Sequence, residues 1–170
     1  ATIYAFSDDI KKGDAKEIEN IFRHAFISTI VFYKKKFGKQ YGDIVICCDG
    51  QKNYRFDIFE NYKGRRKKNR DEEKNKEDGL PWHILFNVMS KIRQESMEFW
   101  PWKVIHENRA EADDVMAVLT EDVANKNIIQ VGVSMEEEPV LMICRDHDMF
   151  QLLKHQNVRQ WDPLLKKFIK

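Results

Sequence analysis

The chain has 170 residues, with 29 Lys and Arg against 28 Asp and Glu, so its formal net charge is +1. A hydrophobic content of 42% with only seven Gly and four Pro excludes a disordered, collagen-like or low-complexity chain. No apolar run approaches the ~18 residues that span a bilayer, and no signal peptide is visible. We therefore expect one domain over residues 1–170, without a membrane partner.

Apolar residues at helical spacing predict three amphipathic helices. The first covers 14–37, with a capping box of Asp14 and Glu17 at its start and Gly38 as its stop. The second covers about 81–99, and the third begins near Ala110. The apolar stripe of the second helix consists of Trp82, Leu85, Phe86, Met89 and Ile92.

Short apolar runs predict strands at 44–48, 102–106 and 139–144, the first and last buried as in a parallel sheet. We also expect a strand at 128–133, a short helix at 149–154, and a hairpin of 158–161 with 166–169. This alternation predicts an α/β fold with a mostly parallel central sheet flanked by helices. The three cysteines, an odd number without zinc spacing, are expected to be buried thiols in a reducing cytoplasm: Cys47, Cys48 and Cys144.

Carboxylates follow three of these strands: Asp49; then Glu111, Asp113 and Asp114; then Asp146 and Asp148. The carboxyl ends of parallel strands meet at one edge of a sheet, so these six acids should converge there. Grouped carboxylates repel one another unless cations lie among them, and oxygen ligands suit Mg²⁺ or Mn²⁺. Two such ions ~3.5–4 Å apart are a common device for cleaving phosphodiesters.

Each acidic group alone has another interpretation. Acids at a helix N-terminus are favoured by the helix dipole, and an Asp-x-Asp after a strand is often a turn. Asp49 also fits the nucleophile of a phosphotransferase or phosphatase. The coincidence of all three groups at one edge favours the metal site.

A basic segment follows Asp49. Residues 63–70 hold six cations and no acid, and residues 71–78 hold five acids. Because no apolar stripe is present, we expect an exposed, mobile segment over 62–80. A solvated loop and a phosphate-binding arm both fit, and the position near Asp49 favours the arm. Core packing in a helix is predicted for most of the preceding aromatic residues, with base stacking for some of them: Tyr54, Phe56, Phe59 and Tyr62.

Taken together, these motifs resemble the 5′-nuclease (flap endonuclease) family, and its phage members in particular. The resemblance covers almost the whole chain in order. It is carried by Cys48-Asp49 with Tyr54-Arg55, Tyr62-Lys63-Gly64-Arg65-Arg66, Glu111-Ala112-Asp113-Asp114, Asp146-His147-Asp148 and Asn157-Val158-Arg159-Gln160-Trp161. It implies a PIN-like core with a basic helical arch over the active site.

The resemblance also implies an enzyme, a Mg²⁺-dependent 5′→3′ exonuclease, flap endonuclease and ribonuclease H that removes RNA primers and 5′ flaps during DNA replication. The six acids would bind two Mg²⁺, or Mn²⁺ instead, while Lys63 and Arg66 would contact the scissile phosphate. The residues implied in nucleic-acid binding are Tyr62, Lys63, Arg65, Arg66, Lys67, Lys68 and Arg70. DNA and RNA–DNA duplex ends would be the substrates of a monomeric enzyme in the host cytoplasm, with a single-strand-binding protein and a sliding clamp as partners.

The chain departs from the family at two places. The family begins with a strand that carries an Asp ligand, and Asp8 and Asp9 are poor substitutes because they follow no strand. The family also continues into a helix–hairpin–helix module that binds the duplex. We therefore expect the central part of a longer nuclease, with doubtful activity on its own. An insertion of roughly ten residues around 127–138, relative to the phage members, fits a surface loop.

Two rival functions remain, a non-catalytic module that binds flap junctions and a phosphotransferase acting through Asp49. The balanced net charge excludes neither of the nucleic-acid functions. Without the six predicted ligands, 22 acids stand against 29 bases, which leaves a net charge of +7 for the rest of the chain.

Overall fold

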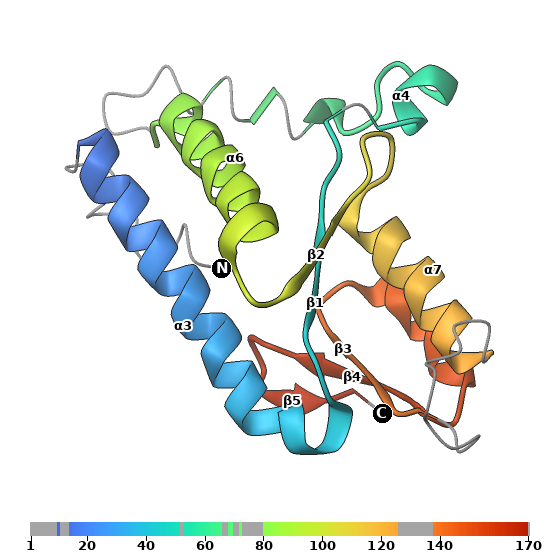
Figure 1. Ribbon diagram of the computed structural model, residues 1–170. Helices are drawn as coiled ribbons and strands as arrows, with labels where there is room; N and C mark the ends of the chain where they lie inside the picture. Colours follow the sequence, from blue (N-terminus) through green and yellow to red (C-terminus); the bar gives the residue numbers. More distant parts are fainter. Residues whose placement is uncertain are drawn as a thin grey trace. The chain divides into compact units, whose positions relative to one another are not determined.

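The computed structural model describes residues 10, 14–51, 53–65, 68–69, 72, 80–125 and 138–169 (Figure 1). Helices and strands alternate along the chain, so the predicted α/β class is confirmed. The helices are α3 (Ala15–Tyr41), α4 (Arg55–Ile58), α6 (Trp82–Phe99), α7 (Ala112–Ala124) and the 3₁₀ helix η1 (His147–Lys154). The strands are β1 (Val45–Cys48), β2 (Lys103–His106), β3 (Val140–Ile143), β4 (Val158–Asp162) and β5 (Lys167–Phe168).

The chain divides into two compact units, each built from two separate stretches. We call Ala1–Lys35 with Tyr54–Lys103 the helical unit, and Lys36–Asn53 with Val104–Lys170 the sheet unit. The long helix α3 contributes residues to both units. All six predicted acids belong to the sheet unit, and the basic segment belongs to the helical unit.

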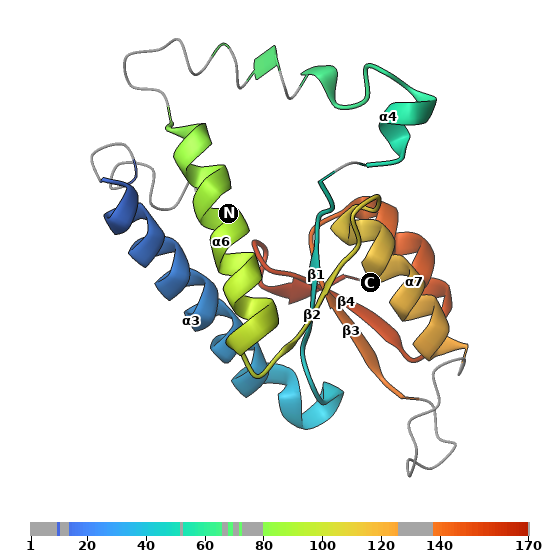
Figure 2. The ribbon, with the colours of Figure 1, turned by 45° about the horizontal axis from the view of Figure 1, so that its top comes forward.

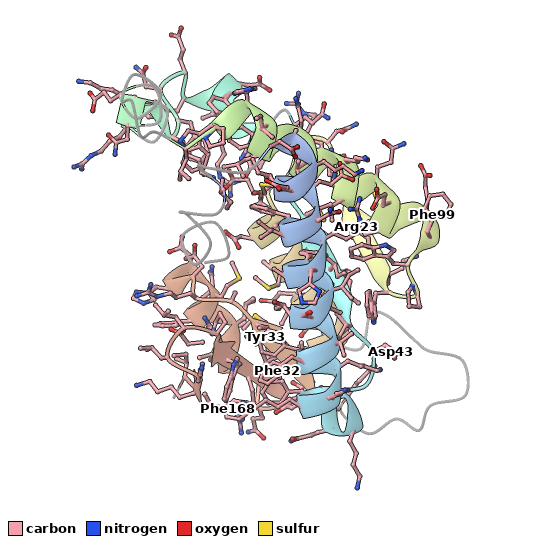
Figure 3. All side chains as sticks on the ribbon, turned by 90° about the vertical axis from the view of Figure 1, so that its left-hand side faces the viewer. Arg23, Phe32, Tyr33, Asp43, Phe99 and Phe168 are labelled. Carbon is pink, nitrogen blue, oxygen red and sulfur yellow. The ribbon has the colours of Figure 1, made fainter. Side chains whose placement is uncertain are left out.

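In the helical unit, α3 packs beside α6 (Figure 2). Ile18 and Phe22 of α3 and Leu85 and Ile92 of α6 lie in one buried cluster. At the edge of this contact Arg23 (Figure 3) binds Glu95 of α6, with its Nη2 at 2.8 Å from Glu95 Oε1. The 3.6-residue spacing of the apolar positions therefore produces the two predicted helices and the apolar faces through which they pack.

The stripe predicted for α6 is partly wrong. Trp82, Leu85 and Ile92 are buried, but Phe86 and Met89 are 46% and 45% exposed. Val88, which was not in the predicted stripe, is buried and lies in the same cluster. The buried face is narrower than the run of apolar residues on this helix, because one neighbouring helix covers only part of its circumference.

The predicted capping box at the start of α3 is present. The backbone N–H of Glu17 donates to Asp14 Oδ1 at 2.9 Å, and the N–H of Asp14 donates to Glu17 Oε2 at 3.1 Å. These two bonds satisfy amides that the first turn of a helix leaves without partners. The local sequence therefore determines where this helix begins.

The predicted stop at Gly38 is wrong, because α3 continues to Tyr41. A glycine inside a helix costs only about 1 kcal/mol. The flanking Phe37 is buried, with its ring 5.1 Å from that of Trp161, and this packing favours another helical turn. Gly42 ends the helix with a φ of 74°, a left-handed conformation that glycine adopts without strain.

The strands of the sheet unit form two small sheets. β1 pairs with β2, and β3, β4 and β5 form a second sheet in that order. β3 and β4 are parallel, with Met142 opposite Gln160, and β5 returns antiparallel to β4 as the predicted hairpin. Figure 1 shows the chain passing in the same direction through β1 and β2, and α7 begins at the end where both strands finish.

Apolar residues of β3, β4 and η1 form the core of the sheet unit, together with the inner face of α7. The buried members are Met142, Met149, Leu152 and Val158. The prediction that the strand at 44–48 would be buried on both faces is wrong, because Val45 is 48% exposed and the rest of β1 is half-buried. The three cysteines are likewise half-buried rather than buried, and all are free thiols.

Some predictions fall outside the described residues. These are the strand at 128–133 and most of the insertion around 127–138. Among the helices that the structure describes, none is long and apolar enough to cross a membrane.

Candidate active site

Asp49 joins the end of β1 to the start of α7. It follows directly after Cys48, the last residue of β1, and is exposed. Its Oδ1 accepts a hydrogen bond of 2.8 Å from the backbone N–H of Ala112, the first residue of α7. A carboxylate at a helix N-terminus is stabilised by the unpaired amides and by the helix dipole. Asp49 therefore lies at the start of the helix that carries the second acidic group.

Gly50 brings the same two segments into backbone contact. Its N–H donates to the carbonyl oxygen of Ala110 at 2.8 Å. A Cβ atom at this position would lie 2.2 Å from the carbonyl oxygen of Glu107 and 2.6 Å from that of Asn108. Only glycine permits so close an approach, and the loop that precedes α7 is thereby held against the end of β1.

Two of the three acids at the start of α7 cap the helix. Glu111 is the N-cap, and its backbone N–H donates to Asp114 Oδ2 at 2.9 Å. Glu111 and Asp114 thus form a capping box, the structural alternative considered for this motif. Capping does not exclude a second role, because each carboxylate has two oxygens that accept several bonds.

Asp113 lies near the ends of β1 and β3. The pKa of the Cys47 thiol, on β1, is raised to about 11, mainly by burial and then by the charges of Cys48 and Asp113. The pKa of the Cys144 thiol, just after β3, is also raised to about 11 by burial, with Asp113 and Asp146 adding to the rise and a hydrogen bond from the Asp146 backbone opposing it. Asp113 therefore acts electrostatically on both strand ends.

The third acidic group follows β3. Asp146 is the N-cap of η1, and its Oδ1 accepts a 2.9 Å hydrogen bond from the backbone N–H of Asp148. Both acids are exposed, and an open hollow beside them is lined by Arg145, Asp146 and His147. One local hydrogen bond thus closes this turn, which is the second structural alternative considered for the motif.

The donor set fits a hard divalent cation in its chemistry. All six predicted ligands are carboxylates, which Mg²⁺ and Mn²⁺ prefer. Among the residues that the structure describes, however, no three His, Cys, Asp or Glu side chains lie close enough together to hold a metal ion. Four of the six carboxylates accept backbone N–H groups, those of Asp49, Glu111, Asp114 and Asp146. Metal binding by these six residues stays a prediction.

The basic segment is described only in part. Tyr62, Lys63, Arg65 and Lys68 lie within the described residues, and Arg66, Lys67 and Arg70 lie outside them. Lys63 has a φ of 55°, and its ammonium lies 5.4 Å from the ring centroid of Tyr62. The guanidinium of Arg55 lies 5.8 Å from the same ring centroid.

The prediction that the aromatic residues before this segment pack in a core is wrong for three of them. Tyr54, Phe56 and Phe59 are 39%, 49% and 60% exposed, and α4 buries none of its residues. A helix of four residues is too short to present a continuous apolar face to a neighbour. Exposed rings beside cations remain compatible with base stacking.

Several residues near the acids were not singled out from the sequence. Gly50 is one, and no pattern marks its contacts because they depend on a loop distant in sequence. His106 is another; it ends β2, and its buried Nε2 has no hydrogen-bond partner among the described residues. The sequence signal that could have identified His106 was a titratable side chain at the end of a predicted strand.

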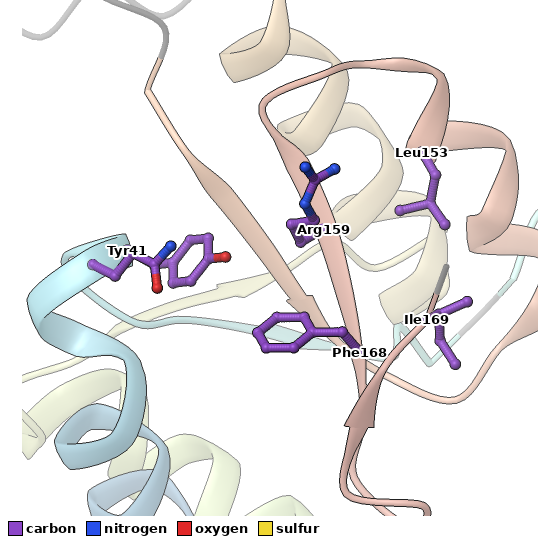
Figure 4. Close-up of a pocket in the computed structure, with 6 residues that line it drawn as sticks. Tyr41, Leu153, Arg159, Phe168 and Ile169 are labelled. Carbon is purple, nitrogen blue, oxygen red and sulfur yellow. The ribbon is translucent and has the colours of Figure 1, made fainter.

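The sheet unit also has a hollow away from the acids (Figure 4). Its volume is about 490 Å³, and none of the six predicted acids, all of which are described, lines it. The lining residues are Gln40, Tyr41, Leu153, Arg159, Phe168 and Ile169. The candidate active site is therefore the region where the end of β1 meets the start of α7, with the turn after β3 as its proposed third part.

One known family matches almost the whole chain. The model of the N-terminal resolvase-like domain of the 5′-3′ exonucleases matches residues 3–170. The chain belongs to this family. It is 32% identical over 154 residues to the Ribonuclease H of Enterobacteria phage T4, which covers 89% of the chain and 46% of that relative. The predicted resemblance to the 5′-nucleases and to a phage member is confirmed, and the chain spans about half the length of this relative.

Proposed function

We propose that the chain carries the catalytic core of a Mg²⁺-dependent 5′-nuclease that removes RNA primers and 5′ flaps during DNA replication. Family membership supports nuclease chemistry on nucleic acid. The observation that carries the site assignment is the 2.8 Å bond between Asp49 and the N-terminus of α7. This bond holds Asp49 at the start of α7, and the proposed site also includes Asp146 from the turn after β3.

The proposed ligands are Asp49, Glu111, Asp113, Asp114, Asp146 and Asp148. When bound, two divalent cations supply the positive charge that activates a water molecule and offsets charge on the attacking and leaving oxygens. Backbone N–H groups hold and orient four of these carboxylates, those of Asp49, Glu111, Asp114 and Asp146. The products would be a 5′-phosphate and a 3′-hydroxyl.

The basic segment is proposed to bind the substrate. Lys63 and Arg66 would contact the scissile phosphate, where fixed positive charge stabilises the charge that develops in the transition state. The other proposed contacts to the single strand are Tyr62, Arg65, Lys67, Lys68 and Arg70. Cations that pair with phosphates also release counterions, which makes binding sensitive to salt.

The test is cleavage of a 5′-labelled flap by the full-length protein with and without Mg²⁺. We expect Mg²⁺-dependent product, and its loss in the double variant Asp113→Asn with Asp146→Asn. Asp122→Asn, on the same helix α7 but outside the proposed ligand set, is the control and should cleave normally. An unchanged rate in the folded double variant would show that the mechanism is wrong.

A non-catalytic junction-binding module is the second candidate. It is supported by the backbone hydrogen bonds of Asp49, Asp114 and Asp146, which give these acids a structural role that needs no metal. It would bind flap junctions in a salt-sensitive manner, unaffected by Mg²⁺ and without product. The same flap assay, run beside a binding assay, separates the two functions.

The upstream Asp-bearing strand and the downstream duplex-binding module also stay predictions, which the reading frame on either side would test.

A further inference from the structure

Gln160 of β4 reaches the turn that carries Asp146 and Asp148. It lies opposite Met142 in the parallel ladder, and its side chain is fully buried. Its Nε2 donates to the carbonyl oxygen of Asp146 at 3.0 Å and to that of Cys144 at 3.3 Å. One amide of β4 therefore holds the backbone beyond the end of β3 at two points.

The chemistry of this position argues for a role beyond packing. The Oε1 of Gln160 is buried and has no hydrogen-bond partner among the described residues. A buried acceptor without a partner opposes folding, and an apolar side chain of the same size would avoid this cost. What only the amide provides is its pair of donors to the two carbonyl oxygens.

The two hydrogen bonds from Gln160 anchor one side of the turn that carries Asp146 and Asp148. The core of the sheet unit anchors the other side. Met149 and Leu152 of η1 are buried in the sheet-unit core, which fixes the chain after Asp148. Between the two anchors, Asp146 Oδ1 accepts the N–H of Asp148. The backbone that carries the two exposed acids is thus anchored on both sides of the turn.

We propose that Gln160 is a positioning residue that holds Asp146 and Asp148 in the arrangement needed to bind divalent cations. The inference rests on the proposed function, because it takes these two acids as ligands. Gln160 acts through the backbone carbonyl oxygens of Cys144 and Asp146 and touches neither metal nor substrate. Replacing a residue that holds a metal ligand in place typically lowers metal affinity by ~10–100-fold.

The test replaces Gln160 by Met, which keeps the size of the side chain and removes both donors. Hydrogen exchange of the Asp148 amide, Mn²⁺ binding by calorimetry and thermal unfolding are measured on the full-length protein. We expect Asp148 to exchange at least about tenfold faster and Mn²⁺ to bind about tenfold more weakly, while the protein stays folded. Ser96→Ala, which removes a buried hydroxyl from α6, is the control and should change neither exchange at Asp148 nor Mn²⁺ affinity.

Gln160→Glu provides a second variant of the same size, in which an acceptor replaces the donors. Unchanged exchange and Mn²⁺ affinity in either folded variant would overturn the inference. Loss of the fold in both variants would also overturn it, since Gln160 would then serve stability alone. Exchange at Asp148 needs no metal, so a wild-type protein that binds no Mn²⁺ would contradict the proposed function while leaving the positioning measurable.

Discussion

At the scale of single residues, Asp49 and Gly50 join two segments that are distant in sequence. The Asp49 side chain binds the first amide of α7, and the Gly50 backbone binds the loop just before it. Asp49 makes its bond through the carboxylate. Gly50 makes its bond through the backbone, which can approach the loop closely because glycine has no side chain. The position of Asp49 in the candidate site therefore depends on its neighbour as much as on its own charge.

Gly50→Ala is expected to destabilise the protein by about 2–3 kcal/mol, because an added Cβ would overlap carbonyl oxygens at 2.2–2.7 Å. Urea unfolding measures this change. Gly64→Ala is the matched control, since its Cβ would meet only the Asn61 Cβ at 3.9 Å within the described surroundings. It should shift the unfolding free energy by less than about 1 kcal/mol. Equal effects of the two substitutions would contradict the assigned role of Gly50.

The positions of the acids were predictable where an acid directly follows a strand. The acids after β1 and β3 were expected at those strand ends, and the structure places them there. The contacts of Gly50 and Gln160 were not predictable, because they depend on how segments far apart in sequence pack together. A glycine in a turn and a glutamine in a strand are also found where no such contact is made.

At the scale of elements, the pairing of α3 with α6 combines an apolar contact with ion pairs. Arg23 binds both carboxylate oxygens of Glu95, at 2.8 and 3.0 Å. Lys91 of α6 binds Glu19 of α3 at 2.8 Å. The pKa of the Glu95 carboxyl is lowered by Arg23, and that of Glu19 is lowered by Lys91 and then by Arg23.

These lowered pKa values predict a loss of stability in acid. A carboxyl whose pKa is lower in the folded state contributes stability above its unfolded pKa of about 4.5, and this stability is lost as the pH falls through the folded value. Glu95→Gln should cost about 1 kcal/mol at pH 7 and less near pH 3. Chemical unfolding at both pH values measures the difference.

Glu98→Gln, on the same helix, is the control for this prediction. Its carboxylate accepts a hydrogen bond from the neutral amide of Gln94 at 3.0 Å, so its removal should have little effect at either pH. A cost for Glu95→Gln that does not change with pH would contradict the ion-pair assignment.

Helix starts were predictable from local signals, and burial was not. The capping box at Asp14 specified the start of α3, but its end depended on the packing of Phe37 against Trp161. The half-exposed β1 and the exposed Phe86 show the same dependence. Which faces are covered is decided by neighbouring elements, and a local pattern does not contain that information.

At the scale of the whole molecule, the net charge of +1 conceals two groups of residues with opposite charge. The candidate site holds six acids in the sheet unit, and the basic segment belongs to the helical unit. A protein can therefore be neutral overall and still bind a polyanion through one charged surface.

Arg65→Ala with Lys68→Ala should weaken binding to a flap junction and lower the slope of log affinity against log salt by about 1–2. Both side chains are exposed, so the fold should be unaffected. Lys35→Ala with Lys39→Ala makes the same change of charge on α3 and should leave the slope unaltered. A titration by fluorescence anisotropy at several salt concentrations measures it, and equal slopes for the two double variants would contradict the assignment of the basic segment.

The interleaving of the two units has a consequence for synthesis on the ribosome. β1 and Asp49 emerge after α3, and α4 and α6 of the helical unit follow before α7, β3 and β4 appear. Closing so long a loop is slow, because the entropy must be lost before the contacts form. A nascent chain therefore carries the carboxylates of the candidate site as separate, unassembled parts. The segments that carry them can assemble only when nearly all of these residues have left the ribosome, so any activity of the proposed site begins late in synthesis.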